Sequence, residues 1–199
     1  MQSLLPFTVF ALVASITPGP ANILVLSSSA RFGLMPALRL MLGICVAASS
    51  IVLFTGWGLG GLLMAHPGMQ TAARWVALVW LTHLSWLLFR HPPEVPQAGD
   101  TGPGQIGMLE GGGLQIVNPK VWMMALAVVS VFAGNGPDKS TRVALMALIF
   151  FAAAVLCMAL WALLGRGVAM LLHAPQHWRW LNQALAVLLL LSAWSSMLG

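Results

Sequence analysis

The sequence is dominated by long apolar runs that are separated by short polar gaps. A helix that crosses the hydrocarbon core of a membrane, about 30 Å thick, needs roughly 20 mostly apolar residues, and the chain offers six runs near that length. We predict six transmembrane helices, at Leu4–Ser29, Ala37–Ala65, Thr71–Phe89, Leu109–Ala133, Val143–Leu164 and Leu181–Leu198. This pattern is typical of an all-α, polytopic membrane protein.

The longest polar gap lies between the third and fourth runs. Residues 91–107 are rich in Pro and Gly and contain Glu94 and Asp100, which is typical of a linker. We expect one transmembrane domain in which this linker separates a first half, residues 1–90, from a second half, residues 108–199. Each half has three spans. Since three is odd, two halves with the same fold must be inserted in opposite orientations, as an inverted repeat.

The composition agrees with insertion in a membrane. Hydrophobic residues make up 59% of the chain, charged residues make up 7%, and the mean hydropathy is +0.91, values that exclude an ordinary soluble domain. The formal charge of +5 comes from Lys and Arg residues that are scattered singly near the ends of the apolar runs. We therefore expect a lipid bilayer, and not a nucleic acid, as the partner of the basic residues.

Lys and Arg residues also predict the orientation of the chain. With Lys120 set aside, the side of the membrane that holds the amino terminus has Arg74, Lys139 and Arg142, and the opposite side has Arg31, Arg39, Arg90, Arg166 and Arg179. Because cytoplasmic loops are enriched in Lys and Arg, we expect both termini to be periplasmic. The first run should be retained, since Met1–Ser3 lacks the basic residue of a signal peptide.

Two of the apolar runs are interrupted by proline at corresponding places in the two halves. The interruptions are Thr17–Asn22 in the first run and Val117–Val121 in the fourth, and each contains a carboxamide, Asn22 or Asn118, next to or near proline. Inside a membrane, backbone without helical hydrogen bonds persists only where protein or water satisfies it. Two matched interruptions are typical of the central site of a transporter.

The first break has several groups that can hold a charged substrate. Pro18 and Pro20 each lack a backbone donor, and Gly19 between them allows conformations that other residues avoid. The helix that restarts after the break should direct the positive end of its dipole toward a carboxylate, and Thr17 and Asn22 add polar side chains. The alternative is a simple proline kink, which membrane helices tolerate through neighbouring groups.

In the second break, Pro119 is followed by Lys120, the one cation within the fourth run. If that span began only after Lys120, it would be too short to cross the membrane at 1.5 Å per residue. A start at Leu109 buries the ammonium deeply, whereas a start at Ile116 lets it reach the headgroups. Both depths stay open, so Lys120 is a candidate for the site in one case and an interfacial anchor in the other.

Few titratable residues are candidates for a proton relay. His83 is the one histidine well inside a predicted span, and its unperturbed pKa near neutrality suits proton transfer, although a lone His on an apolar helix also serves as a packing residue. Glu110 is the carboxylate nearest to a span. We predict no cofactor, no metal site and no catalytic residue, and hence no enzyme.

The motifs resemble those of a known family. Thr17–Leu26 followed by Arg31–Gly33, and later Asn118–Trp122, are similar to the lysine exporter superfamily (LysE/RhtB), in particular to its homoserine and threonine exporters. The resemblance implies a secondary transporter of the bacterial inner membrane that exports amino acids or similar small metabolites, driven by the proton motive force. By motif match it assigns the central site to Pro18, Gly19, Pro20, Asn22, Asn118, Pro119 and Lys120.

The chain departs from this family pattern at several positions. Ala21 stands where many relatives carry Asn, and the second run has Ala47 and Ile51 where Gly and His are frequent. The third run has Trp80, His83 and Ser85 where Tyr, Tyr and Gly are usual in relatives. The substrate of this chain therefore need not be that of the family members it resembles.

Our leading hypothesis is export of a zwitterion by alternating access. Its carboxylate would meet the freed N–H groups near Asn22 or the ammonium of Lys120, and its ammonium would meet exposed carbonyls before Pro18 or Pro119. A membrane thiol-disulfide carrier is an alternative, but it needs reactive thiols at the breaks. Cys45 and Cys157 lie in other runs, 27 residues after Pro18 and 38 residues after Pro119, and these unequal offsets argue against such a carrier.

Two further alternatives lack residues that their chemistry requires. A metal-ion exporter needs a cluster of ligands inside the membrane, which the predicted spans do not supply. An intramembrane hydrolase needs a nucleophile against a base, but His83 and Ser85 are two residues apart and point to different helix faces. Small residues in the second and fifth runs allow close packing, either within the chain or in a homo-oligomer.

Overall fold

The computed structural model describes residues 4–59, 65–90, 105–134, 137–172 and 174–198, and these residues are almost entirely helical. Some side chains inside helices, those of Pro119 and Lys120 among them, lie outside the described part. The helices are α1 (Leu5–Ile16), α2 (Pro20–Phe32), α3 (Leu34–Phe54), the π-helical turn η1 (Thr55–Leu59), α5 (Pro67–Arg90), α6 (Met108–Val117), α7 (Pro119–Phe132), α8 (Lys139–Leu171) and α9 (Pro175–Leu198).

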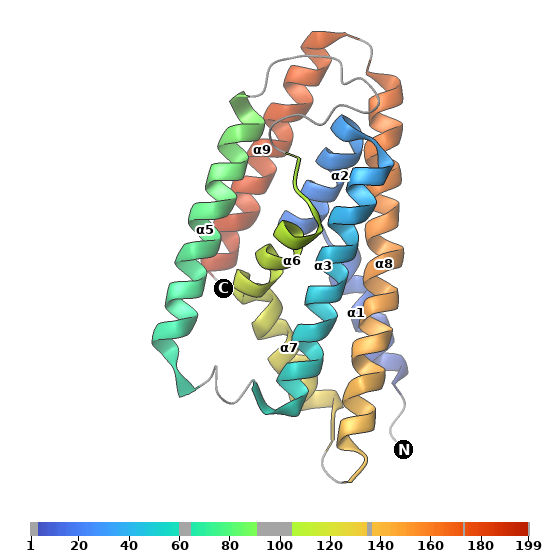
Figure 1. The fold of residues 1–199 in the computed structure, drawn as a ribbon, viewed down its shortest axis with the longest axis vertical. Coiled ribbons are helices and arrows are strands. Elements are labelled where there is room, and N and C mark those ends of the chain that lie inside the picture. Colours follow the sequence, from blue (N-terminus) through green and yellow to red (C-terminus); the bar gives the residue numbers. More distant parts are fainter. Residues whose placement is uncertain (1–3, 60–64, 91–104, 135–136, 173, 199) are drawn as a thin grey trace.

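The helices stand side by side in an elongated bundle (Figure 1). The long helices α3 and α8 pack against each other, and α2 packs against both of them. The helices α5 and α9 form a pair along another side of the bundle, and α9 also contacts α2. The segment α6–α7 is bent, and α6 lies against α3. The bends in α1–α2 and α6–α7 therefore come to lie inside one bundle.

Two helices are long and apolar enough to cross a membrane on their own, α3 extended by η1 and α8. The bent pairs α1–α2 and α6–α7 meet the same criteria as pairs, which gives up to four spans among the described residues. The remaining long helices, α5 and α9, have 24 residues each. Each of the six predicted runs thus corresponds to one long helix or to one bent pair.

Some predicted boundaries were wrong. The second run was expected to reach Ala65; α3 ends at Phe54 and η1 ends at Leu59, and residues 60–64 lie outside the described part. Within η1, Gly58 has φ +119°, a value that suits glycine, and interrupts the helical backbone. In contrast, α8 has 33 residues, longer than the predicted Val143–Leu164, because the helix continues through the polar residues 139–142 at its start and through residues 165–171, which include Arg166, at its end.

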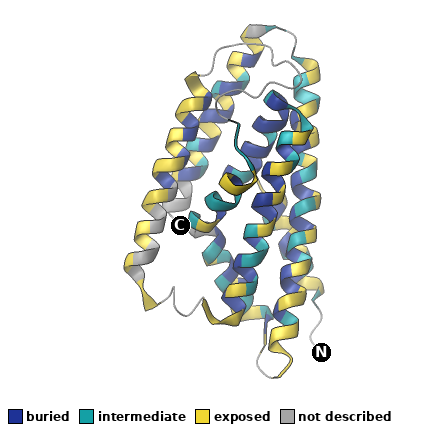
Figure 2. Ribbon diagram, viewed as in Figure 1, coloured by how far each residue is buried: buried dark blue, intermediate teal, exposed yellow. Residues whose placement is uncertain are grey.

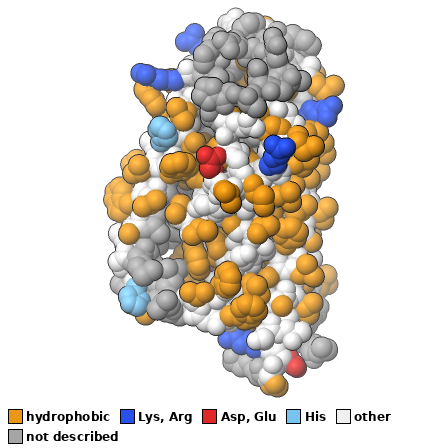
Figure 3. Space-filling model, viewed as in Figure 1, with side chains coloured by type: hydrophobic (Ala, Val, Ile, Leu, Met, Phe, Trp, Pro, Cys, Tyr) orange, Lys and Arg blue, Asp and Glu red, His pale blue; other side chains and the backbone are white. Residues whose placement is uncertain are grey.

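Burial is concentrated on α2, where nearly every residue from Asn22 to Ala30 is buried (Figure 2). The outer surfaces of the other helices carry large exposed apolar side chains. Figure 3 shows such side chains over a wide band of one face, with several charged side chains toward its two ends and one acidic and one basic side chain within the upper part of the band. This distribution fits a protein whose outer surface contacts lipid.

Close helix contacts are made at glycines. A Cβ atom on Gly165 of α8 would collide with the carbonyl oxygen of Leu26 in α2. Likewise, a Cβ atom on Gly43 of α3 would collide with the backbone of Met108 at the start of α6. Small residues allow such backbone approach in membrane proteins. These two contacts fix one arm of each bent helix pair against a long straight helix.

Candidate functional site

Both breaks lie where the prolines predict them. In the first, α1 ends at Ile16 and α2 starts at Pro20, and the axes of the two helices differ by 54°. In the second, α6 ends at Val117, and residues 121–132 of α7 continue at an angle of 66°. Neither bend is a slight kink of a continuous helix. In each, the chain leaves helical geometry for at least one residue, Gly19 and Asn118 having extended backbones.

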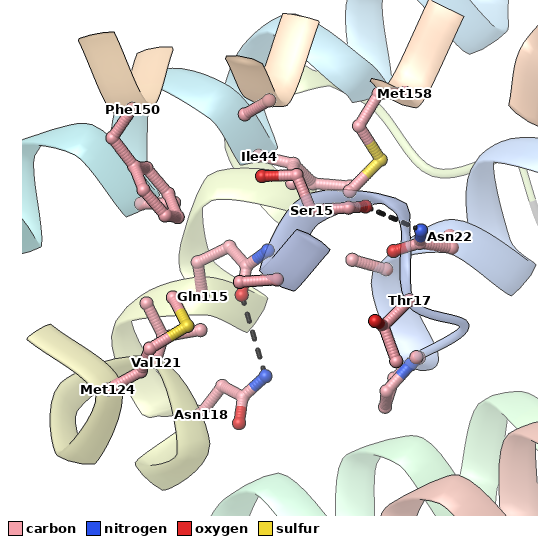
Figure 4. Close-up of a pocket in the computed structure, with 16 residues that line it drawn as sticks. Ser15, Thr17, Asn22, Ile44, Gln115, Asn118, Val121, Met124, Phe150 and Met158 are labelled. Carbon is pink, nitrogen blue, oxygen red and sulfur yellow. Dashed lines mark hydrogen bonds between the residues drawn. The ribbon is translucent and has the colours of Figure 1, made fainter. Parts of the chain in front are cut away.

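A cavity of about 80 Å³ lies where the two breaks meet (Figure 4). Its walls come from both halves of the chain, on helices α1, α2, α3, α6, α7 and α8. The lining residues are Ala14, Ser15, Thr17, Gly19, Pro20, Ala21, Asn22, Ile44, Ala48, Gln115, Asn118, Val121, Met124, Phe150, Ala154 and Met158. No charged side chain is among these described lining residues.

The predicted site residues are largely brought together. The lining includes Thr17, Gly19, Pro20, Asn22 and Asn118. By contrast, Pro18 is exposed and is absent from the lining. For Pro119 and Lys120, whose backbones begin α7, the predicted roles fall on side chains outside the described part of the structure.

Side chains satisfy the carbonyl groups that the first break releases. The amide of Asn22, which is 5% exposed, donates from Nδ2 to the Ser15 carbonyl oxygen at 2.9 Å. The indole of Trp161 in α8 donates from Nε1 to the Ile16 carbonyl oxygen at 3.2 Å. These carbonyls were expected to meet a substrate ammonium, but each already accepts a bond. An ammonium would need a second lone pair on either oxygen.

The second break is held by groups of its own segment. The indole of Trp122 donates from Nε1 to the Ile116 carbonyl oxygen at 2.7 Å. The amide of Asn118 donates from Nδ2 to Oε1 of Gln115 at 3.5 Å, the upper limit of hydrogen-bond geometry. At both breaks, therefore, a carboxamide and an indole donate hydrogen bonds to carbonyl or amide oxygens.

Donor groups at the first break point toward an anion site. Because α2 begins at Pro20, the N–H groups of Ala21 and Asn22 lie in its first turn, where no carbonyl of the helix can accept from them. The first turn of α2 holds no acidic residue that would neutralise the helix dipole. In addition, the Ser15 hydroxyl is buried and has no hydrogen-bond partner among the described residues. This end of the cavity is suited to a carboxylate.

Apolar side chains form the rest of the cavity wall. Phe150, Ala154 and Met158 come from α8, Ile44 and Ala48 from α3, and Val121 and Met124 from α7. In Figure 4, Phe150 and Met158 border one side of the cavity, while Thr17 and Asn118 border the opposite side. The cavity thus has a polar end at the breaks and an apolar wall against α8.

Ser15 and Gln115 are functional candidates that the sequence reading missed. Both are buried, at 7% and 5% exposed, and both line the cavity. Each is an isolated polar residue in an apolar run within about one turn before a break. That signal was available, because an unpaired polar group inside a membrane is costly and is retained where a partner or a function exists.

The predicted proton-relay residues lie away from the cavity. His83 is exposed on α5, with its ring centroid 6.4 Å from that of Trp80. Glu110 is exposed at the start of α6, where Oε2 accepts a hydrogen bond from the Gly107 N–H at 2.6 Å. This contact is a helix cap. The structure brings neither side chain to the lining.

A match to a family model decides the class of the protein. The model of the LysE type translocator matches residues 12–198. The chain belongs to the LysE type translocator family. The resemblance seen in the motifs is thereby confirmed, and the translocator is a transporter and not an enzyme.

Curated relatives of the translocator are efflux proteins. A cysteine/O-acetylserine efflux protein of Klebsiella pneumoniae is 27% identical over 187 residues, covering 94% of this chain and 93% of the relative. Another, of Escherichia coli O1:K1 / APEC, is 25% identical over the same coverage. One of Salmonella choleraesuis is 26% identical over 126 residues, and this match spans 63% of each chain. No solved structure gives a significant match.

The residues required by the alternative hypotheses are not assembled at the breaks. Cys45 and Cys157 are free and buried on α3 and α8, and neither lines the cavity. No group of three or more His, Cys, Asp or Glu residues that could hold a metal ion occurs within the described ranges. A thiol-disulfide carrier and a metal-ion exporter thus gain no support from the geometry of this region.

Proposed function

We propose that this translocator exports small amino acids or their derivatives across the bacterial inner membrane. The observation that carries the proposal is the cavity to which a broken helix from each half of the chain contributes. A site that two separate bent elements share can be exposed to either side of the membrane by their relative movement. The names of the efflux relatives support an amino acid as the substrate.

The proposed topology has six spans in an inverted repeat of three plus three. Its halves are residues 1–90 and 108–199, joined by the linker 91–107, and each begins with a bent helix. Figure 1 supports this arrangement, because successive long elements run in alternate directions along the bundle. The distribution of Lys and Arg favours periplasmic termini. In this scheme α5 and α9 are the third and sixth spans.

In the proposed complex the substrate binds as a zwitterion. The carboxylate accepts hydrogen bonds from the first-turn N–H groups of α2 and from the Ser15 hydroxyl. The ammonium donates to the amide oxygens of Asn118 and Gln115, which lie across the cavity (Figure 4). Lys120, whose backbone is in the first turn of α7, is a second candidate partner for the carboxylate.

Coupling to the proton motive force is part of the proposal. The described lining residues contain no His, Asp, Glu or Lys, so we propose a proton route through residues outside this lining. His83 and Glu110 are the candidates to test. A proton that moved through either of them would link the orientation of the transporter to the pH gradient without contact with the substrate.

The proposal is tested with purified protein in proteoliposomes. Labelled amino acids, including cysteine and O-acetylserine, are offered with and without an imposed pH gradient, and liposomes without protein serve as the control. We expect protein-dependent movement of at least one amino acid with an uncharged side chain, and we expect the pH gradient to accelerate it. Absence of movement for the whole panel would overturn the proposal. Unchanged transport in a Cys45→Ala, Cys157→Ala variant would rule out thiol-disulfide chemistry.

A further inference from the structure

The apolar wall of the cavity contains a large–small–large stripe on α8. Phe150, Ala154 and Met158 are four residues apart, so they lie on one face of the helix. All three are buried and line the cavity. The two large side chains stand on either side of Ala154, and the space above this alanine is therefore part of the cavity.

Helix α3 contributes a large–small pair to the neighbouring wall. Ile44 and Ala48 are also four residues apart, and both line the cavity. Because α3 packs against α8, the two alanines, Ala48 and Ala154, meet the cavity from adjacent helices. We call these two alanines the cavity floor. A floor of methyl groups leaves room that larger residues at either position would occupy.

The polar end of the cavity fixes how a substrate would lie on this floor. The Ser15 hydroxyl, buried and without a partner among the described residues, lines the cavity together with the first turn of α2. A carboxylate held there directs the rest of the molecule toward α3 and α8. The side chain of the substrate, and not its backbone groups, then meets the floor.

We infer that Ala154, with Ala48, sets the length of the substrate side chain, and that Phe150 and Met158 confine it laterally. The inference rests on the proposed function and names the substrate class as amino acids with short, uncharged side chains. A charged side chain would be buried without a counter-charge among the described lining residues, which is costly. Thioether and aromatic walls suit an apolar or sulfur-containing side chain.

The test uses a series of unbranched amino acids that differ by one methylene: alanine, 2-aminobutyrate, norvaline and norleucine. Ala154→Val places two additional methyl groups on the floor. We expect the ratio of norvaline to alanine transport to fall about tenfold or more, the usual discrimination for a methylene-sized change in an apolar pocket. The matched control is Ala152→Val, since Ala152 is exposed on the same helix and is absent from the lining.

A second variant acts in the opposite direction. Phe150→Leu enlarges the cavity beside the floor, and we expect it to raise the ratio of norleucine to alanine transport. If Ala154→Val does not accumulate as a folded protein, Phe150→Leu decides: an increased ratio supports the inference, and an unchanged ratio overturns it. Folding is checked by thermal unfolding of the purified variants.

The outcomes separate the inference from the proposed function. If the wild-type protein transports none of the series and none of the earlier panel, the proposed function fails. If the wild type transports the series but Ala154→Val lowers all members equally, or leaves the ratio as in Ala152→Val, the inference fails and the transport function stands. A shift of the ratio in Ala154→Val alone supports both.

Discussion

The break in α1–α2 and the break in α6–α7 contain the same kinds of residues, but different parts of the molecule hold them. At the first break, an indole from α8 reaches the Ile16 carbonyl, and Asn22 spans the break to the Ser15 carbonyl. At the second, Trp122 and Asn118 bond to Ile116 and Gln115 of the same bent segment. One of these hydrogen bonds at the first break comes from another helix, α8, whereas those at the second come from the same bent segment.

The helices that follow the two breaks differ in the same sense. Nearly every residue of α2 is buried between α3, α8 and α9. In α7, Met123, Ala127, Ser130 and Val131 are exposed, and Val121, Ala125 and Val128 are buried. Segments with few buried contacts open at lower free energy than segments with many. We therefore expect α2 to be the fixed wall of the site and α7 to be the arm that moves during transport.

The largest expected effect separates the two carboxamides. Asn22→Ala removes the hydrogen bond across the first break and leaves the Ser15 carbonyl without this donor. The first-turn N–H groups of α2, which we propose bind the substrate carboxylate, then lose their position. We expect roughly a 5- to 150-fold loss of transport, which corresponds to about 1–3 kcal/mol for a buried acceptor left without its donor. Asn118→Ala removes one of the two amide oxygens proposed for the substrate ammonium and leaves the other, that of Gln115, so it should lose less. Initial rates in proteoliposomes measure both, and equal losses would contradict the fixed-wall interpretation.

The next effect concerns the contact that fastens α2 to α8. Gly165→Ala forces a Cβ against the Leu26 carbonyl and should cost about 1–3 kcal/mol of stability by overpacking. Gly167→Ala is the control, because no atom lies within 4 Å of its Cβ position. Thermal unfolding in detergent should show a lower Tm for Gly165→Ala and an unchanged or slightly higher Tm for Gly167→Ala. The same Tm for both variants would show that α2 and α8 are not closely packed at this contact.

An equivalent pair of variants probes the half that contains the second break. Gly43→Ala forces a Cβ against the Met108 backbone, while Gly113→Ala meets no atom within 4 Å. We expect a lower Tm for Gly43→Ala only, because overpacking should again reduce the free energy of unfolding by about 1–3 kcal/mol. Because this contact fixes α6 and not α7, we expect the two variants to differ in stability. A gain of stability in Gly43→Ala would refute the close packing of α3 on α6.

The smallest expected effects come from the two indoles. Trp161→Phe and Trp122→Phe each keep an aromatic ring and remove the N–H donor, at a cost of about 1 kcal/mol per lost hydrogen bond. Trp161→Phe should lower the Tm, since it removes the hydrogen bond between α8 and the end of α1. Trp122→Phe should mainly change transport rate, since it loosens the hinge of α7. Hydrogen exchange in α7 that rises in Trp161→Phe but not in Trp122→Phe would reverse this assignment.

The sequence allowed the breaks and their carboxamides to be predicted, because proline and isolated polar residues act locally in an apolar run. The indole of Trp161 could not be predicted, since it reaches Ile16 only after α8 packs on α1. The exposure of His83 was also out of reach. The third run is apolar around most of its circumference, and periodicity then cannot separate a face toward protein from a face toward lipid.

The helix ends show a similar division. Gly58 marks an interruption of the second predicted span by its positive φ, a property that glycine permits and the sequence could suggest. The extension of α8 to Lys139–Leu171 was missed, because the polar residues 139–142 and Arg166 lower the hydropathy at the two ends of the apolar run. Local residue chemistry predicted where helices break, but not how far helices continue past the apolar runs.

Protection of the cavity by substrate tests the central claim most directly. In a Cys45→Ala, Cys157→Ala background, Thr17→Cys places a thiol at the exposed rim of the cavity, and Ser130→Cys places one on the outer face of α7. With a transported amino acid at about ten times its Kd, alkylation of Thr17→Cys should slow about tenfold, in proportion to the free fraction of sites. The rate at Ser130→Cys should not change. Equal alkylation rates at Thr17→Cys with and without that amino acid would contradict binding between the two breaks.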